Sequence, residues 1–176
     1  MRCKRVIAII VLLATLVIAL YFIDKKLPVL LAKDLPAADS VLVKKAERKL
    51  YLMRDGITYR SYNIALGGNP EGHKQQEGDQ RTPEGRYLLD WRNIKSAYHR
   101  SLHVSYPNSK DRTQAAAMSV PPGGMIMIHG QPNGLGWLSP LLQLWDWTDG
   151  CIAVSNVEIE EIWRAVGNGT PILIEP

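Results

Sequence analysis

Two side chains suited to acyl-transfer chemistry occur in this sequence, His129 and Cys151. His129 follows the apolar run at 125–128, and Cys151 follows Gly150 in a turn-like segment. A thiol attacks an acyl carbon as thiolate, and a free cysteine has a pKa of about 8.5. A nearby imidazole can take that proton and hold an ion pair, while backbone N–H groups beside Gly150 could face a developing oxyanion. The pattern predicts a cysteine nucleophile with a histidine acid/base, and a buried structural thiol with a hydrogen-bonded core histidine is the alternative.

The segment before the domain favours export. The 18 residues from Val6 to Ile23 carry no charge and follow Arg2, Lys4 and Arg5. As a helix this run reaches about 27 Å, close to the hydrocarbon thickness of a bilayer, and it exceeds the usual apolar core of a cleaved signal. Only a poor cleavage site at 17–19 is present. We expect residues 1–5 in the cytoplasm and 6–23 as an uncleaved signal anchor, with a cleaved signal as the alternative.

This placement implies a single-pass protein of a bacterial inner membrane, whose remaining residues face the periplasm or cell wall. Cys3 and Cys151 would then lie on opposite sides of the membrane and could not pair. A lone thiol is usually avoided in an oxidising compartment unless it is used, which favours the catalytic interpretation of Cys151.

One strand-rich domain at 40–176 must position the two residues, after a stalk at 24–39 that contains prolines and small residues. The turn signal Asp55-Gly56 predicts a hairpin, and a helix at 157–166 has apolar residues at helical spacing with Ser155 or Asn156 as its cap. The other predicted elements are strands at 40–45, 49–54, 57–66, 86–90, 101–106, 125–128 and 171–175, and a short helix at 109–118.

Two long connections between these elements carry functional signals. The polar segment at 67–85 is longer than most loops of a compact domain, and such loops are often functional. The segment between His129 and Cys151 contains several Pro and Gly residues and three Trp residues. Indoles offer flat apolar walls, so Trp137 is predicted to form part of a substrate lid. For Trp145 and Trp147, a substrate wall and a plug over the sheet edge are equally favoured.

Four ordered motifs resemble the YkuD-type L,D-transpeptidase catalytic domain family. After His129 come the eighteen residues 130–147, then Thr148, and Gly150-Cys151 completes the family's pattern. Upstream, Thr82-Pro83-Glu84-Gly85 and the strand that ends in Pro107-Asn108 resemble two further family segments. The resemblance spans about 40–176.

The resemblance implies a mainly β, sandwich-like fold with short helices, preceded here by one transmembrane helix. It also implies that Cys151 attacks the diaminopimelate–D-Ala bond of a peptidoglycan stem tetrapeptide, and that an amine then takes the acyl group. His129 would act as base and then acid. Thr148 and Gly150 would shape the loop, and Gly130 would allow a tight turn.

The sequence departs from the common family pattern at two positions. Asp149 stands where most members have His, and Ala153 stands where many have an Arg that could read a substrate carboxylate. Arg100 or Arg112 could replace that Arg, although a solvated surface role is favoured for both. Asp149 could steer His129, bind a substrate ammonium, or simply form the turn.

The Thr-Asp-Gly-Cys form resembles a divergent branch of the family. Some relatives in that branch are hydrolases that cut protein from peptidoglycan instead of joining it. A peptidoglycan amidase that releases attached protein or peptide is therefore one alternative function, and a non-catalytic wall-binding module is another. The acyl acceptor stays open among a stem peptide, a lysine of a wall-linked lipoprotein, and water.

The net charge and the spacing of possible metal ligands argue against several other classes of function. The net charge is 21 − 17 = +4, and without Arg2, Lys4 and Arg5 it is 18 − 17 = +1, so we expect no nucleic-acid partner. The histidines at 73, 99 and 103 form no ligand pattern with His129, and paired cysteines are missing. The sequence therefore predicts no metal and no cofactor.

Overall fold

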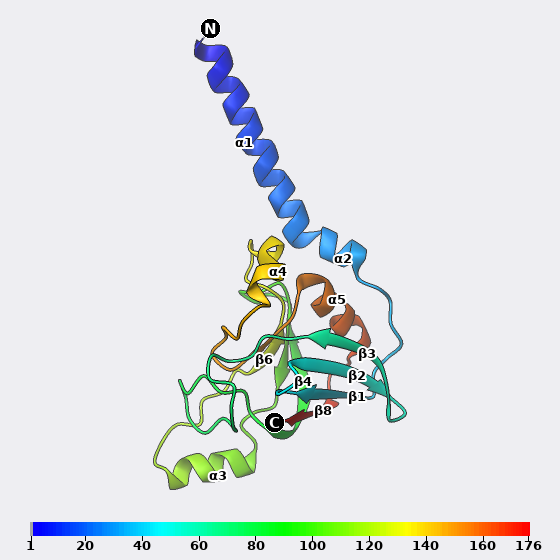
Figure 1. Cartoon of the computed structure of the whole chain (residues 1–176), viewed down its shortest axis with the longest axis vertical. Coiled ribbons are helices and arrows are strands. Elements are labelled where there is room, and N and C mark those ends of the chain that lie inside the picture. Colours follow the sequence, from blue (N-terminus) through cyan, green and yellow to red (C-terminus); the bar gives the residue numbers. More distant parts are fainter. Residues whose placement is uncertain (1) are drawn as a thin grey trace.

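A computed structural model describes residues 2–176 of the chain, with side chains from residue 5 onward. A long helix, α1 (Arg2–Lys25), projects from a domain built on one curled sheet (Figure 1). The sheet has eight strands in the order β3-β2-β1-β8-β4-β5-β6-β7. The predicted mainly β class with short helices is confirmed, although the strands form a single curled sheet and not two separate ones.

The strands are β1 (Ser40–Lys44), β2 (Lys49–Arg54), β3 (Ile57–Asn63), β4 (Gly85–Asn93), β5 (Ser101–Val104), β6 (Met127–His129), β7 (Ile152–Ala153) and β8 (Thr170–Glu175). The other helices are α2 (Leu27–Leu31), α3 (Ser109–Ala117), η1 (Gly136–Leu138), α4 (Ser139–Leu142) and α5 (Asn156–Ala165). All seven predicted strands and the two predicted domain helices are present, with end shifts of a few residues. The elements η1, α4 and β7 were not predicted, because they are too short to show a periodicity.

Alternation along the first hairpin explains why these strands form. Val41 and Val43 of β1 are fully buried opposite Leu52 and Leu50 of β2, while their neighbours along each strand are less buried. Asp55 and Gly56, which connect β2 to β3, both adopt positive φ, as the turn signal predicts. The two strands therefore present one apolar face to the core.

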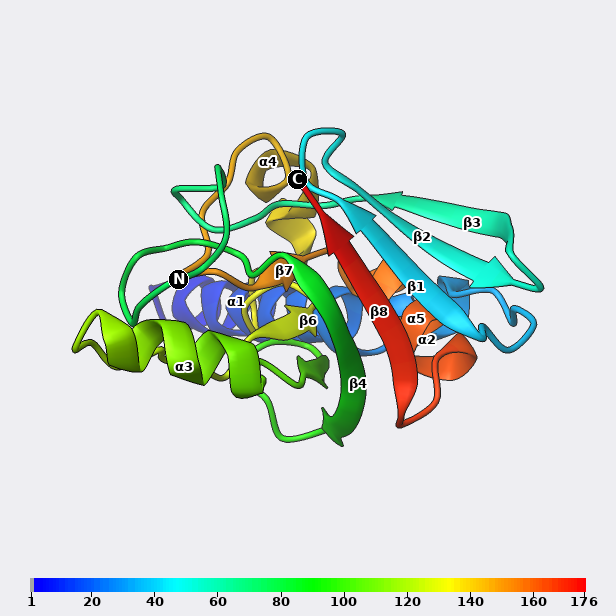
Figure 2. The same ribbon diagram turned by 90° about the horizontal axis from the view of Figure 1, so that it is seen from below.

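Helix α5 closes that core from one side. Ser155 and Glu158 form a reciprocal capping box at its start, so Ser155 is the cap and Asn156 is the first helical residue. Ile159 and Ile162 are fully buried in the same cluster as the sheet residues. Figure 2 shows α5 behind β1 and β8, with α3 at the opposite end of the sheet.

The segment 24–39, which the sequence suggests to be a stalk, folds against the domain. Helix α2 lies on α5, and the guanidinium of Arg164 donates to the carbonyls of Ala32 at 2.8 Å and Val29 at 2.6 Å. The amide of Ala38 donates to the carbonyl of Ala165. These partners lie about 130 positions away in the chain, so local composition could not reveal them.

Helix α1 contains a stretch that is long and apolar enough to cross a membrane, Arg5–Lys25, with a mean hydropathy of 3.1. None of that stretch is buried against the domain except at its end, where the side chain of Asp24 is only 2% exposed. A membrane anchor and a signal sequence both have these properties.

Candidate active site

The pairing of β6 with β7 places Cys151 and His129 on one face of the sheet. In this parallel pair, Ile128 lies opposite Ile152 and both enter the core, while His129 lies opposite Ala153. Extending the register by one residue puts Cys151 opposite Met127, whose amide donates to the Cys151 Sγ at 3.4 Å. Because paired residues point to the same side and successive residues alternate, the two side chains are diagonal neighbours on the non-core face.

The imidazole of His129 is held as a neutral proton acceptor. Its side chain is almost fully buried, and its Nδ1 lies 2.7 Å from the carbonyl oxygen of Gly130. A carbonyl only accepts, so Nδ1 carries the hydrogen and Nε2 keeps its lone pair. Burial lowers the pKa of His129 to about 4, against the opposing effect of the Gly130 hydrogen bond. At neutral pH the ring is therefore uncharged.

The thiol of Cys151 is also neutral at rest. Burial raises its pKa above the ordinary value, and this outweighs the lowering by the Met127 amide. Nearby Asp149 raises the pKa further, whereas Lys74 lowers it. The ion pair between Cys151 and His129 that the residue types suggest is thus disfavoured, because a desolvated site penalises both charges. The arrangement suits transfer of the thiol proton during attack.

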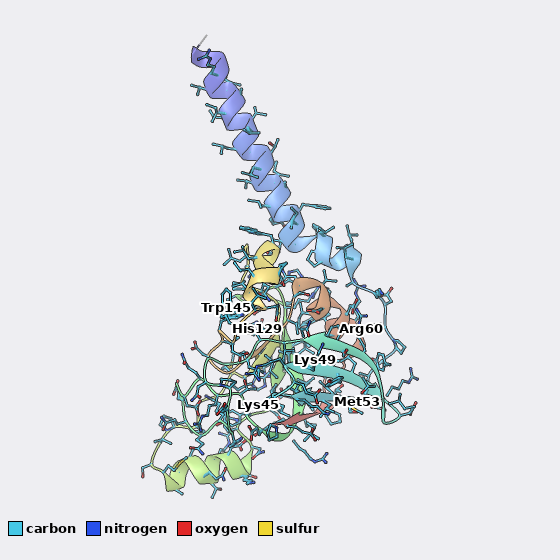
Figure 3. The ribbon with its side chains drawn as sticks, in the orientation of Figure 1. Lys45, Lys49, Met53, Arg60, His129 and Trp145 are labelled. Atoms are coloured by element: carbon cyan, nitrogen blue, oxygen red, sulfur yellow. The ribbon has the colours of Figure 1, made fainter. Side chains whose placement is uncertain are left out.

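Two aromatic rings cover the imidazole. Tyr98 stacks on His129 with ring centroids 4.0 Å apart, and Trp147 meets it edge-on at 5.8 Å. Trp147 is therefore a wall of the site. The sequence did not single out Tyr98, since a lone aromatic residue in an irregular segment has no distinguishing local pattern. Figure 3 shows His129 below α4, with Trp145 to its upper left.

Hydrogen bonds within the loop before Cys151 fix its shape. The hydroxyl of Thr148 donates to the Cys151 carbonyl at 2.8 Å and accepts from the Gly150 amide at 3.2 Å. That amide is thus engaged with Thr148, so the Gly150 N–H is not one of the groups that could face an oxyanion. Gly150 has φ +119°, and a Cβ there would stand 2.5 Å from the carbonyl oxygen of Arg81. Both the conformation and the contact require glycine.

Gly130 is needed for close packing. Its φ is not positive, but a Cβ on it would lie 2.7 Å from the Asn156 Oδ1 and 2.9 Å from the Ile159 Cγ2. The absence of a side chain lets the end of β6 approach α5. The predicted tight turn is therefore replaced by a tight contact between backbone and helix.

A buried ion pair organises the long polar loop at 67–85. Lys74 Nζ lies 2.7 Å from the Asp79 Oδ1, and both side chains are largely buried. Asp79 also accepts the amides of Gln75 and Gln76. Burial by itself raises the pKa of Asp79, but these hydrogen bonds, with that of Lys74 foremost, lower it overall. The length of this loop was a signal of function, but its internal ion pair was not predicted.

The domain that carries these residues matches a known family. The sequence matches the YkuD family, the L,D-transpeptidase catalytic domain, over residues 38–174. The chain belongs to the L,D-transpeptidase catalytic domain family. It is 30% identical over 132 residues to YafK of Escherichia coli (strain K12), a protein named as a candidate L,D-transpeptidase. That match covers 72% of this chain and 46% of YafK, so the chain spans about half the length of this curated relative.

Solved structures show the same fold. The helical cell shape determining protein Pgp2 from Campylobacter jejuni superposes with a TM-score of 0.59 at 27% identity, over 77% of this chain and 46% of that one. An L,D-transpeptidase fragment from Xylanimonas cellulosilytica gives 0.51 at 16% identity, over 81% of this chain and 63% of that one. At 16% identity, the similarity to the Xylanimonas cellulosilytica protein shows only a shared fold.

The remaining predicted residues of this L,D-transpeptidase-family domain lie outside the cluster around His129. The guanidinium of Arg100 is bound to Glu160 at 2.6 Å and lies over the ring of Trp163 at 4.7 Å, which makes it a partner of α5. Arg112 is exposed on α3. Trp137 lies in η1, which contacts α1, and its Nε1 donates to the Gly134 carbonyl.

The two departures from the family pattern differ in exposure. Asp149 is exposed beside Cys151, and its charge raises the pKa of both Cys151 and Tyr98, although burial is the larger cause for each. Ala153 is completely buried, and its amide donates to the carbonyl of Ala65 at 2.8 Å. Among the side chains that the structure describes, from residue 5 onward, His, Cys, Asp and Glu form no group of three that could hold a metal ion.

Proposed function

We propose that this chain is a membrane-anchored peptidoglycan L,D-transpeptidase that uses Cys151 as nucleophile and His129 as general acid and base. The observation that carries the proposal is the shared face of Cys151 and His129, together with the Nδ1 hydrogen bond that leaves the His129 Nε2 as an acceptor. Membership of the L,D-transpeptidase family supports it. The substrate is then the stem tetrapeptide of peptidoglycan.

The first half-reaction starts from a neutral thiol and a neutral ring. The Cys151 proton moves to the His129 Nε2 as the sulfur attacks the diaminopimelate carbonyl carbon, forming a C–S bond and a tetrahedral oxyanion. The bond to D-Ala breaks when His129 returns the proton to the departing amine. A thioester on Cys151 and free D-Ala result.

The second half-reaction repeats these roles. His129 removes a proton from the incoming amine as its nitrogen attacks the thioester carbon. The C–S bond breaks, and the proton returns to the sulfur. Tyr98 and Trp147 contribute to the burial of His129, which lowers its pKa and keeps the ring unprotonated, and so available as the base, at neutral pH.

Hydrolysis of the same thioester is the second candidate. It is favoured by Asp149, an exposed carboxylate beside the nucleophile where most of the family has His. In that case water takes the place of the amine, and the protein would trim stem peptides or release attached protein. The cell-shape role named for Pgp2 agrees with a function in wall remodelling in either case.

The deciding experiment uses the full-length protein in detergent with purified tetrapeptide muropeptides and a diaminopimelate-containing acceptor, followed by mass spectrometry. We expect release of D-Ala and new cross-linked products. Cys151→Ala should abolish both, while the matched variant Cys3→Ser should retain them. D-Ala release with only shortened monomers would identify the hydrolase. Normal products from Cys151→Ala would exclude the nucleophile proposed here.

A further inference from the structure

The base of α1 is locked to the segment that connects His129 with Cys151. The buried carboxylate of Asp24 accepts the amides of Gly134 at 2.9 Å and Gly136 at 2.8 Å. Asn156 of α5 donates to the Asp24 carbonyl at 3.3 Å, and Lys25 bonds to the Asn133 side chain. An apolar helix that ends in such contacts has a fixed direction relative to the domain.

A cluster of exposed apolar side chains surrounds that junction. They come from α2, from η1 with the residue before it, and from α4, and Figure 1 shows α2 and α4 next to the end of α1 that meets the domain. The side chains are 41–71% exposed and comprise Leu30, Leu31, Leu135, Trp137 and Leu141. We call this set the apolar collar. Exposed apolar groups of this size in one place mark an interaction surface.

The position of the collar identifies what it contacts. The collar borders α1, because α2 and η1 both contact that helix, whose membrane-compatible stretch ends at Lys25. If α1 spans a bilayer, the hydrocarbon boundary lies near residues 23–25, so the collar lies at the level of the headgroups. An indole such as Trp137 is suited to that layer, and lysines such as Lys25 and Lys26 extend toward lipid phosphates.

We propose that the apolar collar inserts into the outer surface of the bilayer and seats the domain on the membrane. This rests on the membrane anchoring in the function proposed above. Because Trp137 and Leu141 belong to the connection between His129 and Cys151, the seat also holds that connection in place. The site would thus act on the layer of peptidoglycan near the membrane, at a distance set by the collar.

Spin labels in the full-length chain test this proposal. Cysteines are introduced singly by Leu30→Cys, Leu141→Cys, Val11→Cys and Ile57→Cys in a chain that carries Cys3→Ser and Cys151→Ser. Ile57 is the matched control, since it is as exposed as Leu30, at 70% against 71%, but lies at the turn of the β2–β3 hairpin. Each labelled protein is checked for folding by near-ultraviolet circular dichroism. It is then placed in nanodiscs of phosphatidylethanolamine and phosphatidylglycerol with one chain per disc.

Collisions with lipid-soluble oxygen and a water-soluble nickel chelate give the result. We expect the label at 11 to favour oxygen most, the labels at 30 and 141 to collide more with oxygen and less with the chelate than the label at 57, and the label at 57 to favour the chelate. If 30 and 141 behave like 57 while 11 stays in lipid, the collar proposal is wrong and the anchor stands. If the label at residue 11 also collides mainly with the chelate, both the membrane anchor and the collar proposal are wrong. Protection seen only in vesicles with several chains would assign the collar to a second copy and overturn the proposal.

Discussion

Tyr98 lies flat on the imidazole of His129, with the two ring planes inclined by 28° and their centroids 4.0 Å apart. This contact joins an irregular segment before β5 to the last residue of β6, and it removes one face of the imidazole from water. The low pKa of His129 depends on such coverage, since desolvation is its largest cause. The aromatic neighbour thus contributes to the burial that lowers the pKa of the proposed base.

Replacing Tyr98 tests this relationship. Tyr98→Ala should expose His129 and raise its pKa from about 4 toward the ordinary 6.5, while Tyr98→Phe should leave it low because the stack remains. The acid limb of kcat/KM against pH reports this pKa in the free enzyme. Equal acid limbs for the two variants would mean that stacking does not control the base.

The same burial predicts acid-sensitive stability. The pKa of His129 is lower in the folded chain than in the unfolded chain, so the unfolded state binds more protons between about pH 4 and the ordinary value of 6.5. The stability is therefore complete above that value and falls as the pH drops toward 4, with a slope of up to about 1.4 kcal/mol per pH unit from this group. Denaturant unfolding at pH 7 and pH 5 should show a smaller loss for His129→Gln than for the parent. An identical loss would assign the acid sensitivity to other groups.

Covalent labelling tests the nucleophile directly. Carbapenems acylate other members of the L,D-transpeptidase family. The full-length protein should therefore gain the mass of one carbapenem. Cys151→Ala should lose that adduct with its fold intact, and Cys3→Ser should keep it. Intact-protein mass spectrometry reads the result, and an adduct that survives Cys151→Ala would place the reactive group elsewhere.

Asp149 should act on substrate binding, because its exposed carboxylate can pair with the ammonium group of diaminopimelate. A hydrogen bond to a charged group contributes about 1.5–3 kcal/mol, so Asp149→Asn should raise the substrate Kd by roughly ten- to a hundredfold. The alkylation rate of Cys151 by a small electrophile should barely change. A parallel collapse of thiol reactivity and turnover would instead show that Asp149 orients His129.

Gly150 should tolerate no side chain. Gly150→Ala forces a left-handed conformation that costs about 1–2 kcal/mol and also brings a Cβ to 2.5 Å from the Arg81 carbonyl oxygen. Gly169→Ala is the matched control, since Gly169 has φ +85° with no neighbour within 4 Å of its Cβ position. Chemical denaturation should therefore show a larger loss of stability at 150 than at 169. Similar losses would mean that the contact with Arg81 relaxes without cost.

Much of the fold was predictable because its signals are local. Alternating apolar residues predicted β1 and β2, and the Asp55-Gly56 pair predicted the turn between β2 and β3. Ser155 and Asn156 were the two candidate caps of α5, and the structure shows Ser155 as the cap. Short elements such as η1 and β7 were missed, since three or two residues carry no period. Segment 24–39 looked like a stalk because its partners on α5 are remote in sequence.

For the site, the sequence by itself determined which groups can react: the thiol of Cys151, the imidazole of His129, and the glycine beside the thiol. Residue type and spacing carry that information. Tertiary structure decided that both groups are neutral at rest, that Tyr98 and Trp147 cover the ring, and that Asp24 fixes the direction of α1. The physical reason is that desolvation and hydrogen-bond partners depend on which distant segments pack together, and a linear pattern does not contain that packing.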